Sequence, residues 1–462
     1  MQIFKVSIFN IFYIFCLIIP FLLFITDINV AYSLIIPYSI AMFIAFIIAV
    51  IININTKNRF YSRIYLLTTL FHLLAGIFIQ ILKYKILNLP TIGGFAGIGI
   101  DNDGTLYHNY AKILLQNPQY DTLFFAKIVA IIYKIFGVNE YTVCAINTLF
   151  SGFISFFIVK MGETIYKDNF TVKFLGYITT FSFTVTAYTS VLMRDVYIIL
   201  LSYMIIFFYY VFYKKKNIYY LLFSIFSFFL LCPIRAYAAA ATFIACITAH
   251  LILVSNLKYK NFIIKTNRYM ITVFIMVIVI LTLLIIFQNF LRIDYIISLF
   301  DMDTILKVSE EGYGGANSSF GIDRVALSKC LPLFLLIGYF CMFFAPFPHQ
   351  WLLSKNIVQA FSASETIILY IFLLPSFFMG IIKGFKDRNF IIVSSFLYII
   401  FVFTFYGMIL DNSGAVFRGR APFIPLIYLI ALYNTKGLLL KICNKTKKII
   451  HKGSYYEKNI IS

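Results

Sequence analysis

Side chains that could perform chemistry stand in short polar stretches between long apolar runs. The first such stretch holds Asp101 and Asp103, which flank Asn102 and precede Tyr107 and His108. A carboxylate here could take the proton from an attacking hydroxyl, or hold a divalent cation such as Mg²⁺ or Mn²⁺ between acidic oxygens. His108 could assist that proton transfer or orient Asp103. A solvated Asp-Gly turn that caps the next helix explains the same pattern, so both interpretations stay open.

Arginines dominate the other polar stretches. Arg194 precedes Asp195 at the junction of two apolar runs, and Arg235 lies at another such junction. Arg418 and Arg420 stand directly before a further apolar run. A planar guanidinium group can bind two phosphate oxygens at once, so these arginines predict a site for the phosphate of a lipid, with Asp195 positioning Arg194. For Arg194 and Asp195 the alternative is a helix-capping aspartate with a local ion pair. For Arg418 and Arg420 it is anchoring of a span end at the membrane interface.

The composition predicts that lipid surrounds these polar stretches. The chain of 462 residues is 62% hydrophobic and only 12% charged, with a mean hydropathy of +0.92, which excludes folding around one aqueous core. Hydrocarbon offers no hydrogen bonds, so each crossing segment must satisfy its own backbone, and the runs lack the alternation of a membrane β-barrel. We therefore predict an all-α polytopic transmembrane helix bundle, a single integral membrane domain over residues 1–462 with no soluble domain.

Stretches of about 20 apolar residues mark the expected spans. One further apolar stretch, Leu331 to Trp351, contains Pro346 and Pro348 and is predicted to be re-entrant or interfacial. About 12 spans are expected, at Ile8–Phe24, Ala31–Ile52, Ile64–Leu82, Tyr141–Lys160, Phe174–Leu192, Val196–Tyr213, Ile218–Cys232, Ala236–Val254, Met270–Phe290, Ser364–Ile382, Phe390–Leu410 and Ala421–Leu440.

The distribution of Lys and Arg predicts the orientation, because positive charge in short loops resists translocation. Basic clusters such as Lys214–Lys216 and Lys383–Arg388 place those loops, the basic tail 436–462 and both termini in the cytoplasm. Residues 83–123 and 291–328 become large extracytoplasmic loops. The formal charge of +20 is then a topology signal and an attraction to anionic lipid, with no nucleic-acid partner implied. Five lysines fall on the outer side, against this trend but in a long segment where the charge rule is weaker: Lys83, Lys85, Lys112, Lys127 and Lys134.

Histidine and cysteine add no cofactor site to this picture. The seven cysteines and five histidines show no spacing typical of metal ligands. A divalent cation at Asp101 and Asp103 is therefore the one cofactor that the sequence suggests.

Taken together, the polar stretches resemble bacterial members of the GT-C superfamily of membrane glycosyltransferases, over most of the chain. The resemblance implies a many-helix enzyme of the bacterial inner membrane that moves a sugar from a polyprenyl-phosphate donor to an acceptor on the outer face, beside other glycan-assembly membrane proteins. It implies Asp101 or Asp103 as the catalytic base. The residues that carry it are Asp101-Asn102-Asp103 with Tyr107 and Ala111, Arg194-Asp195, Phe344–Trp351 and Arg418–Pro422.

Three other functions fit parts of the same pattern. An O-antigen or capsular polysaccharide polymerase would use the same arginines on a pyrophosphate-linked glycan. A transporter or flippase for lipid-linked sugars would place ionisable residues at mid-membrane on broken helices, whereas the charges here are expected at span ends. A purely structural membrane subunit would give no reason for the outward arginines.

Overall fold

The computed structural model describes residues 28–81, 103–166, 168–255, 306, 330–345, 347, 364–367, 369, 373–409 and 413–434. These residues form helices and no strand, and seven of the helices are long and apolar enough to cross a membrane. The all-helical architecture is thus confirmed, and the seven apolar helices are consistent with a membrane protein. The expected number of about 12 spans is not confirmed. The expected spans Ile8–Phe24 and Met270–Phe290, the tail 436–462 and loop 291–328 apart from residue 306 lie outside the described residues.

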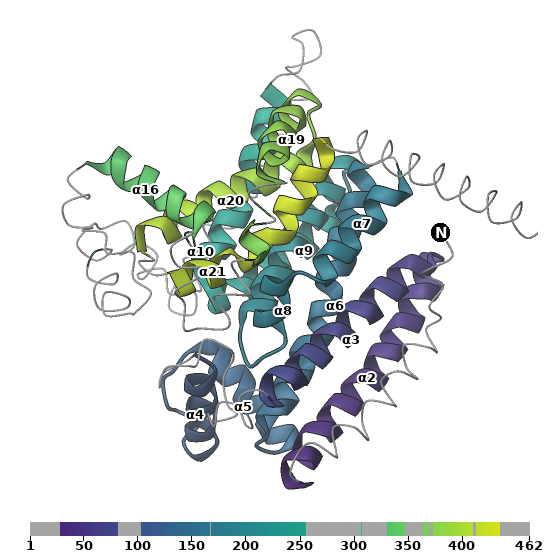
Figure 1. The fold of residues 1–462 in the computed structure, drawn as a ribbon, viewed down its shortest axis with the longest axis vertical. Coiled ribbons are helices and arrows are strands. Elements are labelled where there is room, and N and C mark those ends of the chain that lie inside the picture. Colours follow the sequence, from purple (N-terminus) through teal and green to yellow (C-terminus); the bar gives the residue numbers. More distant parts are fainter. Residues whose placement is uncertain are drawn as a thin grey trace, which may run out of the picture.

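Helices α2 (Ile28–Thr56), α3 (Arg59–Ile81) and α6 (Glu140–Ile165) form one side of the bundle (Figure 1). The first turn of α6 is capped by Asn139, whose side chain accepts a hydrogen bond from the Tyr141 amide at 2.9 Å. The same side chain donates to the Ser33 carbonyl at 2.8 Å, so α6 begins beside the start of the apolar part of α2.

The expected span Phe174–Leu192 is interrupted, which corrects the single helix predicted there. α7 (Asn169–Thr180) ends before α8 (Phe183–Thr189) begins, and Ser182 caps the second helix. The break is stable because the buried Glu365 carboxylate replaces the missing helical partners. Its donors are Ser182 Oγ at 2.6 Å, Thr184 N at 2.7 Å, Thr184 Oγ1 and Tyr428 OH at 2.8 Å.

Helix α10 (Ile218–Ser255) contains a fold-back at Pro233–Arg235. Arg235 has non-helical angles, φ −159° and ψ 82°, two residues after a proline that removes a helical hydrogen bond. The Phe228 and Phe243 rings lie 5.2 Å apart, although fifteen residues of straight helix would separate them by about 22 Å. The two halves are therefore antiparallel, and they correspond to the two spans expected on either side of Arg235.

Helix α9 (Asp195–Lys215) has an acidic residue at its start and two lysines at its end. Asp195 stands in its first turn, and Lys214 and Lys215 stand in its last turn. Its 21 residues give a length of about 31 Å, close to the thickness of membrane hydrocarbon. The chemistry-bearing residues and this basic cluster therefore lie at opposite ends of the bundle.

In the C-terminal part, α16 (Leu331–Phe344) packs against α20 (Phe390–Ile409) through Gly338 and Gly407. A Cβ on either glycine would stand 2.7 Å from backbone atoms of the other, so only glycine permits this approach. Phe343 near the end of α16 contacts Phe403 in the middle of α20, at 4.9 Å between rings. With 14 residues, α16 is about 21 Å long and ends part-way along α20.

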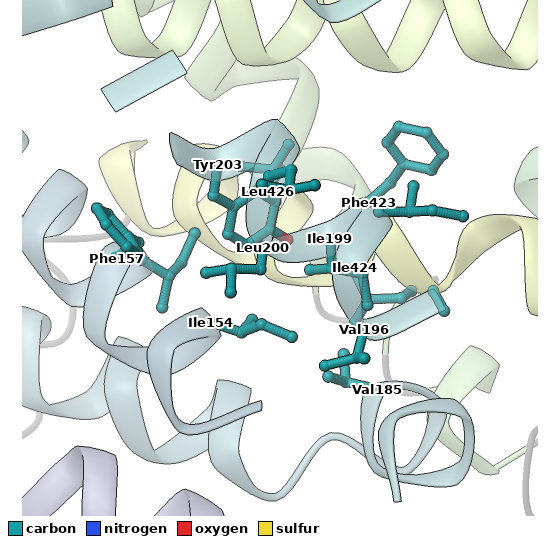
Figure 2. Packing of buried hydrophobic residues seen from close by; sticks show 14 of the residues in the cluster. Ile154, Phe157, Val185, Val196, Ile199, Leu200, Tyr203, Phe423, Ile424 and Leu426 are labelled. Carbon is teal, nitrogen blue, oxygen red and sulfur yellow. The ribbon is translucent and has the colours of Figure 1, made fainter. Parts of the chain in front are cut away.

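The chain then passes through α19 (Leu374–Lys386) and α20 to α21 (Ser413–Arg420) and the 3₁₀ turn η4 (Ala421–Phe423), and it is helical to Asn434. This last segment enters the middle of the bundle, where its side chains meet those of α6, α8 and α9 (Figure 2). Tyr203 of α9 is fully buried there and donates to the Pro422 carbonyl at 2.8 Å. The core thus fixes the position of α21 relative to the start of α9.

Two shorter helices, α4 (Asp103–Gln116) and α5 (Phe124–Phe136), pack on each other beside the lower ends of α2 and α3 (Figure 1). The predicted outer loop 83–123 is therefore helical from Asp103 to Gln116.

Candidate functional site

An arginine bound between two aspartates forms the centre of the site. Arg418 donates from Nη2 to Asp195 Oδ2 at 2.9 Å and from Nε to both carboxylate oxygens at 3.1 and 3.2 Å. Its Nη1 donates to Asp103 Oδ2 at 2.6 Å. The side chains of Asp195, Arg418 and Asp103 are 5%, 18% and 37% exposed, so the Asp195 half of the ion pair is the buried one.

The two carboxylates of the ion pair stand at helix starts. Asp103 and Asp195 are the first residues of α4 and α9, where unsatisfied amides create a positive end. Arg418 lies in α21, where the helical backbone continues through η4 towards Asn434. Tyr107, one turn after Asp103, donates to Asp103 Oδ2 at 3.4 Å. The positive helix starts thus stabilise both carboxylates that bind Arg418.

Arg194 adjoins the ion pair but has no carboxylate partner among the described residues. Its Nη1 donates to the Ile234 carbonyl at 3.4 Å, and its Nε is buried without a hydrogen-bond partner. The guanidinium group lies 5.8 Å from the centre of the Tyr107 ring, a cation–π contact. Among the described residues, the Ile234 carbonyl is therefore the one hydrogen-bond acceptor of the Arg194 guanidinium group.

Arg235 reaches the same region from the fold-back of α10. Its Nη2 donates to the Tyr406 hydroxyl at 3.1 Å, and its Nε donates to the Tyr237 hydroxyl. These partners are neutral phenols, so its charge is not cancelled by them. The same charge acts on Asp103 together with Arg418.

These contacts determine the protonation states of Asp103 and Tyr107. Burial alone would raise the pKa of Asp103, but the charges of Arg418 and Arg235 and the Arg418 hydrogen bond outweigh it, so the pKa is lowered. Burial and the neighbouring Asp103 charge raise the pKa of Tyr107. Asp103 is therefore ionised and Tyr107 is a neutral donor near neutral pH.

Summed over the described residues, the cluster has an excess of positive charge. Three arginines, Arg194, Arg235 and Arg418, stand against two carboxylates, Asp103 and Asp195, which gives 3 − 2 = +1. An uncancelled charge in a membrane protein is unfavourable unless a counter-ion or water accompanies it. The arrangement suits an anionic ligand such as a phosphate.

Two of the predicted site residues point elsewhere. Arg420 is 1% exposed and donates to the Phe343 carbonyl at 3.0 Å and to Thr366 Oγ1 at 2.7 Å, so it does not form a joint clamp with Arg418. His108 is 5% exposed, and its Nδ1 lies 2.8 Å from the Tyr133 hydroxyl of α5, away from Asp103. Asp101 lies outside the described residues.

The described residues do not fit a divalent cation. They contain no group of three or more His, Cys, Asp or Glu side chains that could hold a metal ion. Asp103 and Asp195 both bind Arg418, whose charge repels a cation at the same oxygens.

Sequence reasoning missed the tyrosines around Arg235 and the buried carboxylate at the helix break. Tyr237 follows Arg235 by two residues and so carried a weak local signal, whereas Tyr406 lies in the middle of an apolar run. Glu365 is a single acid near the start of another such run, a position that itself signals a bound carboxylate.

Comparison of the chain with protein-family models, with curated proteins and with solved structures finds no match. The fold and the site define an all-helical membrane protein with an arginine-rich polar cluster at one end of its bundle.

Proposed function

We propose that the protein is a membrane glycosyltransferase that uses a polyprenyl-phosphate-linked sugar donor in the assembly of a cell-surface glycan. The observation that supports this proposal is the convergence of Asp103, Arg194, Asp195, Arg235 and Arg418 from four distant segments on one cluster with excess positive charge. A phosphate on a lipid tail is an anion that reaches such a cluster from within the membrane.

Arg194 and Arg235 are the phosphate-binding residues in this proposal, because Arg418 is already neutralised by two carboxylates. The acceptor hydroxyl attacks the anomeric carbon of the sugar, and the bond from that carbon to the phosphate oxygen breaks. Negative charge then grows on the departing phosphate, where guanidinium groups stabilise the transition state more than the ground state. Arg418 acts as the group that holds Asp103 and Asp195 in place.

Asp103 is the candidate base of the reaction. It is the more exposed of the two carboxylates. Its Oδ2 atom accepts the hydrogen bonds from Arg418 and Tyr107. Oδ1 is then the atom that takes the proton of the acceptor hydroxyl as the new C–O bond forms. The lowered pKa keeps this carboxylate ionised before the reaction.

A transporter of lipid-linked sugars is the second candidate, and Glu365 favours it. This carboxylate is buried at the break between α7 and α8, and ionisable residues beside interrupted helices are typical of transport sites.

The substrate that accumulates after deletion of the gene tests these functions. A transferase leaves an undecorated acceptor, a polymerase leaves single repeat units on lipid, and a transporter leaves the lipid-linked sugar on the cytoplasmic side. Complementation with Arg194→Lys should restore little glycan, whereas the matched control Arg59→Lys, an exposed arginine at the start of α3, should restore wild-type amounts. Full complementation by Arg194→Lys would contradict the assignment of Arg194 to the phosphate.

A further inference from the structure

Helix α5 has an apolar surface on nearly every side. Phe125, Val129 and Tyr133 are buried against the protein, and the opposite side exposes Ile131 and Ile135 by 60% and 67%. A helix that is apolar all round is normally covered by protein or lipid. With 13 residues, however, α5 is about 20 Å long, too short to cross about 30 Å of hydrocarbon.

Two lysines stand among these exposed apolar side chains. Lys127 and Lys134 are the only charged residues of α5, and with Ile131 they follow one stripe at spacings of four and three residues. Ammonium groups on long stems can reach phosphate headgroups while neighbouring side chains enter the acyl region. The stripe thus has the composition of a helix that lies in the surface of a membrane.

The depth of α5 follows from its contacts with α2. Asn139, three residues after α5, donates to the carbonyl of Ser33, which lies in the second turn of α2 (Ile28–Thr56). Gly137, with φ 85°, makes the turn that separates the direction of α5 from that of α6. Phe136 also lines a cavity of about 310 Å³ together with Ile36 and Ile40 of α2, which are exposed on the outside of the bundle. The end of α5 therefore lies beside the N-terminal turns of α2, at one end of that apolar helix.

α5 also carries the helix that presents Asp103. The Tyr107 ring of α4 meets the Phe125 ring edge to face, with centroids 4.9 Å apart. His108 bonds to the Tyr133 hydroxyl, and burial lowers the pKa of this histidine, so it is a neutral partner. Contacts on two successive residues of α4 thus transmit the position of α5 to the ion pair.

We propose that α5 is an interfacial helix that binds anionic phospholipid in the leaflet at this end of the bundle. Ile131, Ile135 and Phe136 enter the acyl region, and Lys127 and Lys134 bind the headgroup phosphates. This accounts for two of the lysines predicted on the outer side against the charge rule, Lys127 and Lys134, because lipid-bound lysines at the interface are not free loop charges. The proposal does not depend on what the arginine cluster binds.

Tryptophan fluorescence tests the depth of the helix. The chain has one tryptophan, so Trp351→Phe gives a background into which Ile135→Trp or Ile131→Trp is introduced. The full-length variants are reconstituted in equimolar phosphatidylcholine and phosphatidylglycerol, with or without brominated acyl chains. Asn109→Trp, at an exposed polar position of α4, is the matched control.

We expect both α5 tryptophans to emit at shorter wavelength than the control and to be quenched by bromolipid but not by aqueous iodide. Asn109→Trp should show the reverse. Quenching of both α5 tryptophans by iodide would overturn the proposal, and so would protection from both quenchers, which would mean that protein covers the face. The two positions provide independent measurements if one substitution prevents folding.

The lysine contribution is measured by competition between spin-labelled phosphatidylglycerol and phosphatidylcholine. Each interfacial lysine should contribute up to about 5-fold to the preference for the anionic lipid. The double variant Lys127→Gln with Lys134→Gln should therefore lower this preference. The control is Lys214→Gln with Lys215→Gln, in the last turn of α9, at the end of that helix opposite Asp195. This control shows whether the loss of any two lysines has the same effect. An unchanged preference in the Lys127 and Lys134 double variant would refute headgroup binding by α5.

Discussion

Replacement of Asp195 by asparagine should destabilise the protein far more than the same change at Asp103. Asp195 receives three of the four hydrogen bonds that Arg418 makes to carboxylates, and its side chain is 5% exposed. Removing one partner from a buried ion pair leaves a buried charge and costs about 3 kcal/mol or more. Asp103 receives one bond and is 37% exposed, so its loss should cost about 1 kcal/mol or less.

The assay is reversible unfolding of the purified protein in mixed micelles of mild detergent and dodecyl sulfate. A difference of 3 kcal/mol corresponds to roughly a 150-fold change in the unfolding equilibrium. Asp121→Asn is the matched control, because this carboxylate is 90% exposed and pairs weakly with Lys127 at 3.7 Å. Its effect should stay within about 0.5 kcal/mol of wild type.

The double variant Asp195→Asn with Arg418→Met separates loss of the pair from burial of a lone charge. If the charge of Arg418 causes most of the damage, removing that charge should recover part of the stability lost in Asp195→Asn. Equal destabilisation by Asp195→Asn and Asp103→Asn would refute this account of the site. So would a double variant whose loss of stability equals the sum of the losses in Asp195→Asn and Arg418→Met alone.

Three further predictions concern charge and sidedness. Because the folded-state pKa of Asp103 is lowered, its stabilising contribution should be complete above its ordinary value of 3.8 and disappear as the pH falls through the folded pKa; a loss near pH 6, measured against Asp103→Asn, would contradict this. If the proposed function holds, Arg194→Lys should reduce glycan synthesis by about 10-fold or more while the amount of protein in the membrane stays normal. Arg420→Lys should instead lower the amount of protein, because Arg420 is buried and bonded to Thr366. Equal protein amounts and equal activity in the two variants would contradict these separate roles. Cysteines at positions 194 and 214 should be labelled from opposite sides of the membrane, the first from outside, and labelling from one side would refute the orientation.

The helical architecture and most of the charged cluster could be predicted from sequence, because both depend on local signals. Long apolar runs specify helices in lipid, and charges between such runs collect at helix ends. Asp103, Asp195 and Arg418 were all singled out in this way. Their direct contact could not be predicted, since it depends on which helix ends the packing brings together.

The helix break between α7 and α8 and the direction of the Arg420 side chain could not be predicted in this way. The break between α7 and α8 requires the Glu365 carboxylate, which is 183 residues from Ser182. Arg420 was grouped with Arg418 because of its spacing, yet two residues on a helix differ by about 200° in direction, so the two side chains leave α21 on different sides. Helical periodicity alone could have indicated this separation.

The order in which the chain is synthesised gives the ion pair a further consequence. Asp195 enters the membrane long before Arg418, which follows it by 223 residues. Until α21 is made, both carboxylates of the cluster lack the arginine that binds them in the folded protein. Completion of this cluster is therefore a late event in biogenesis, and a chain that ends before Arg418 retains an acid whose counter-charge was never made. Such a chain is expected to be recognised as unfinished by membrane proteases, so that premature termination reduces the amount of protein as well as its activity.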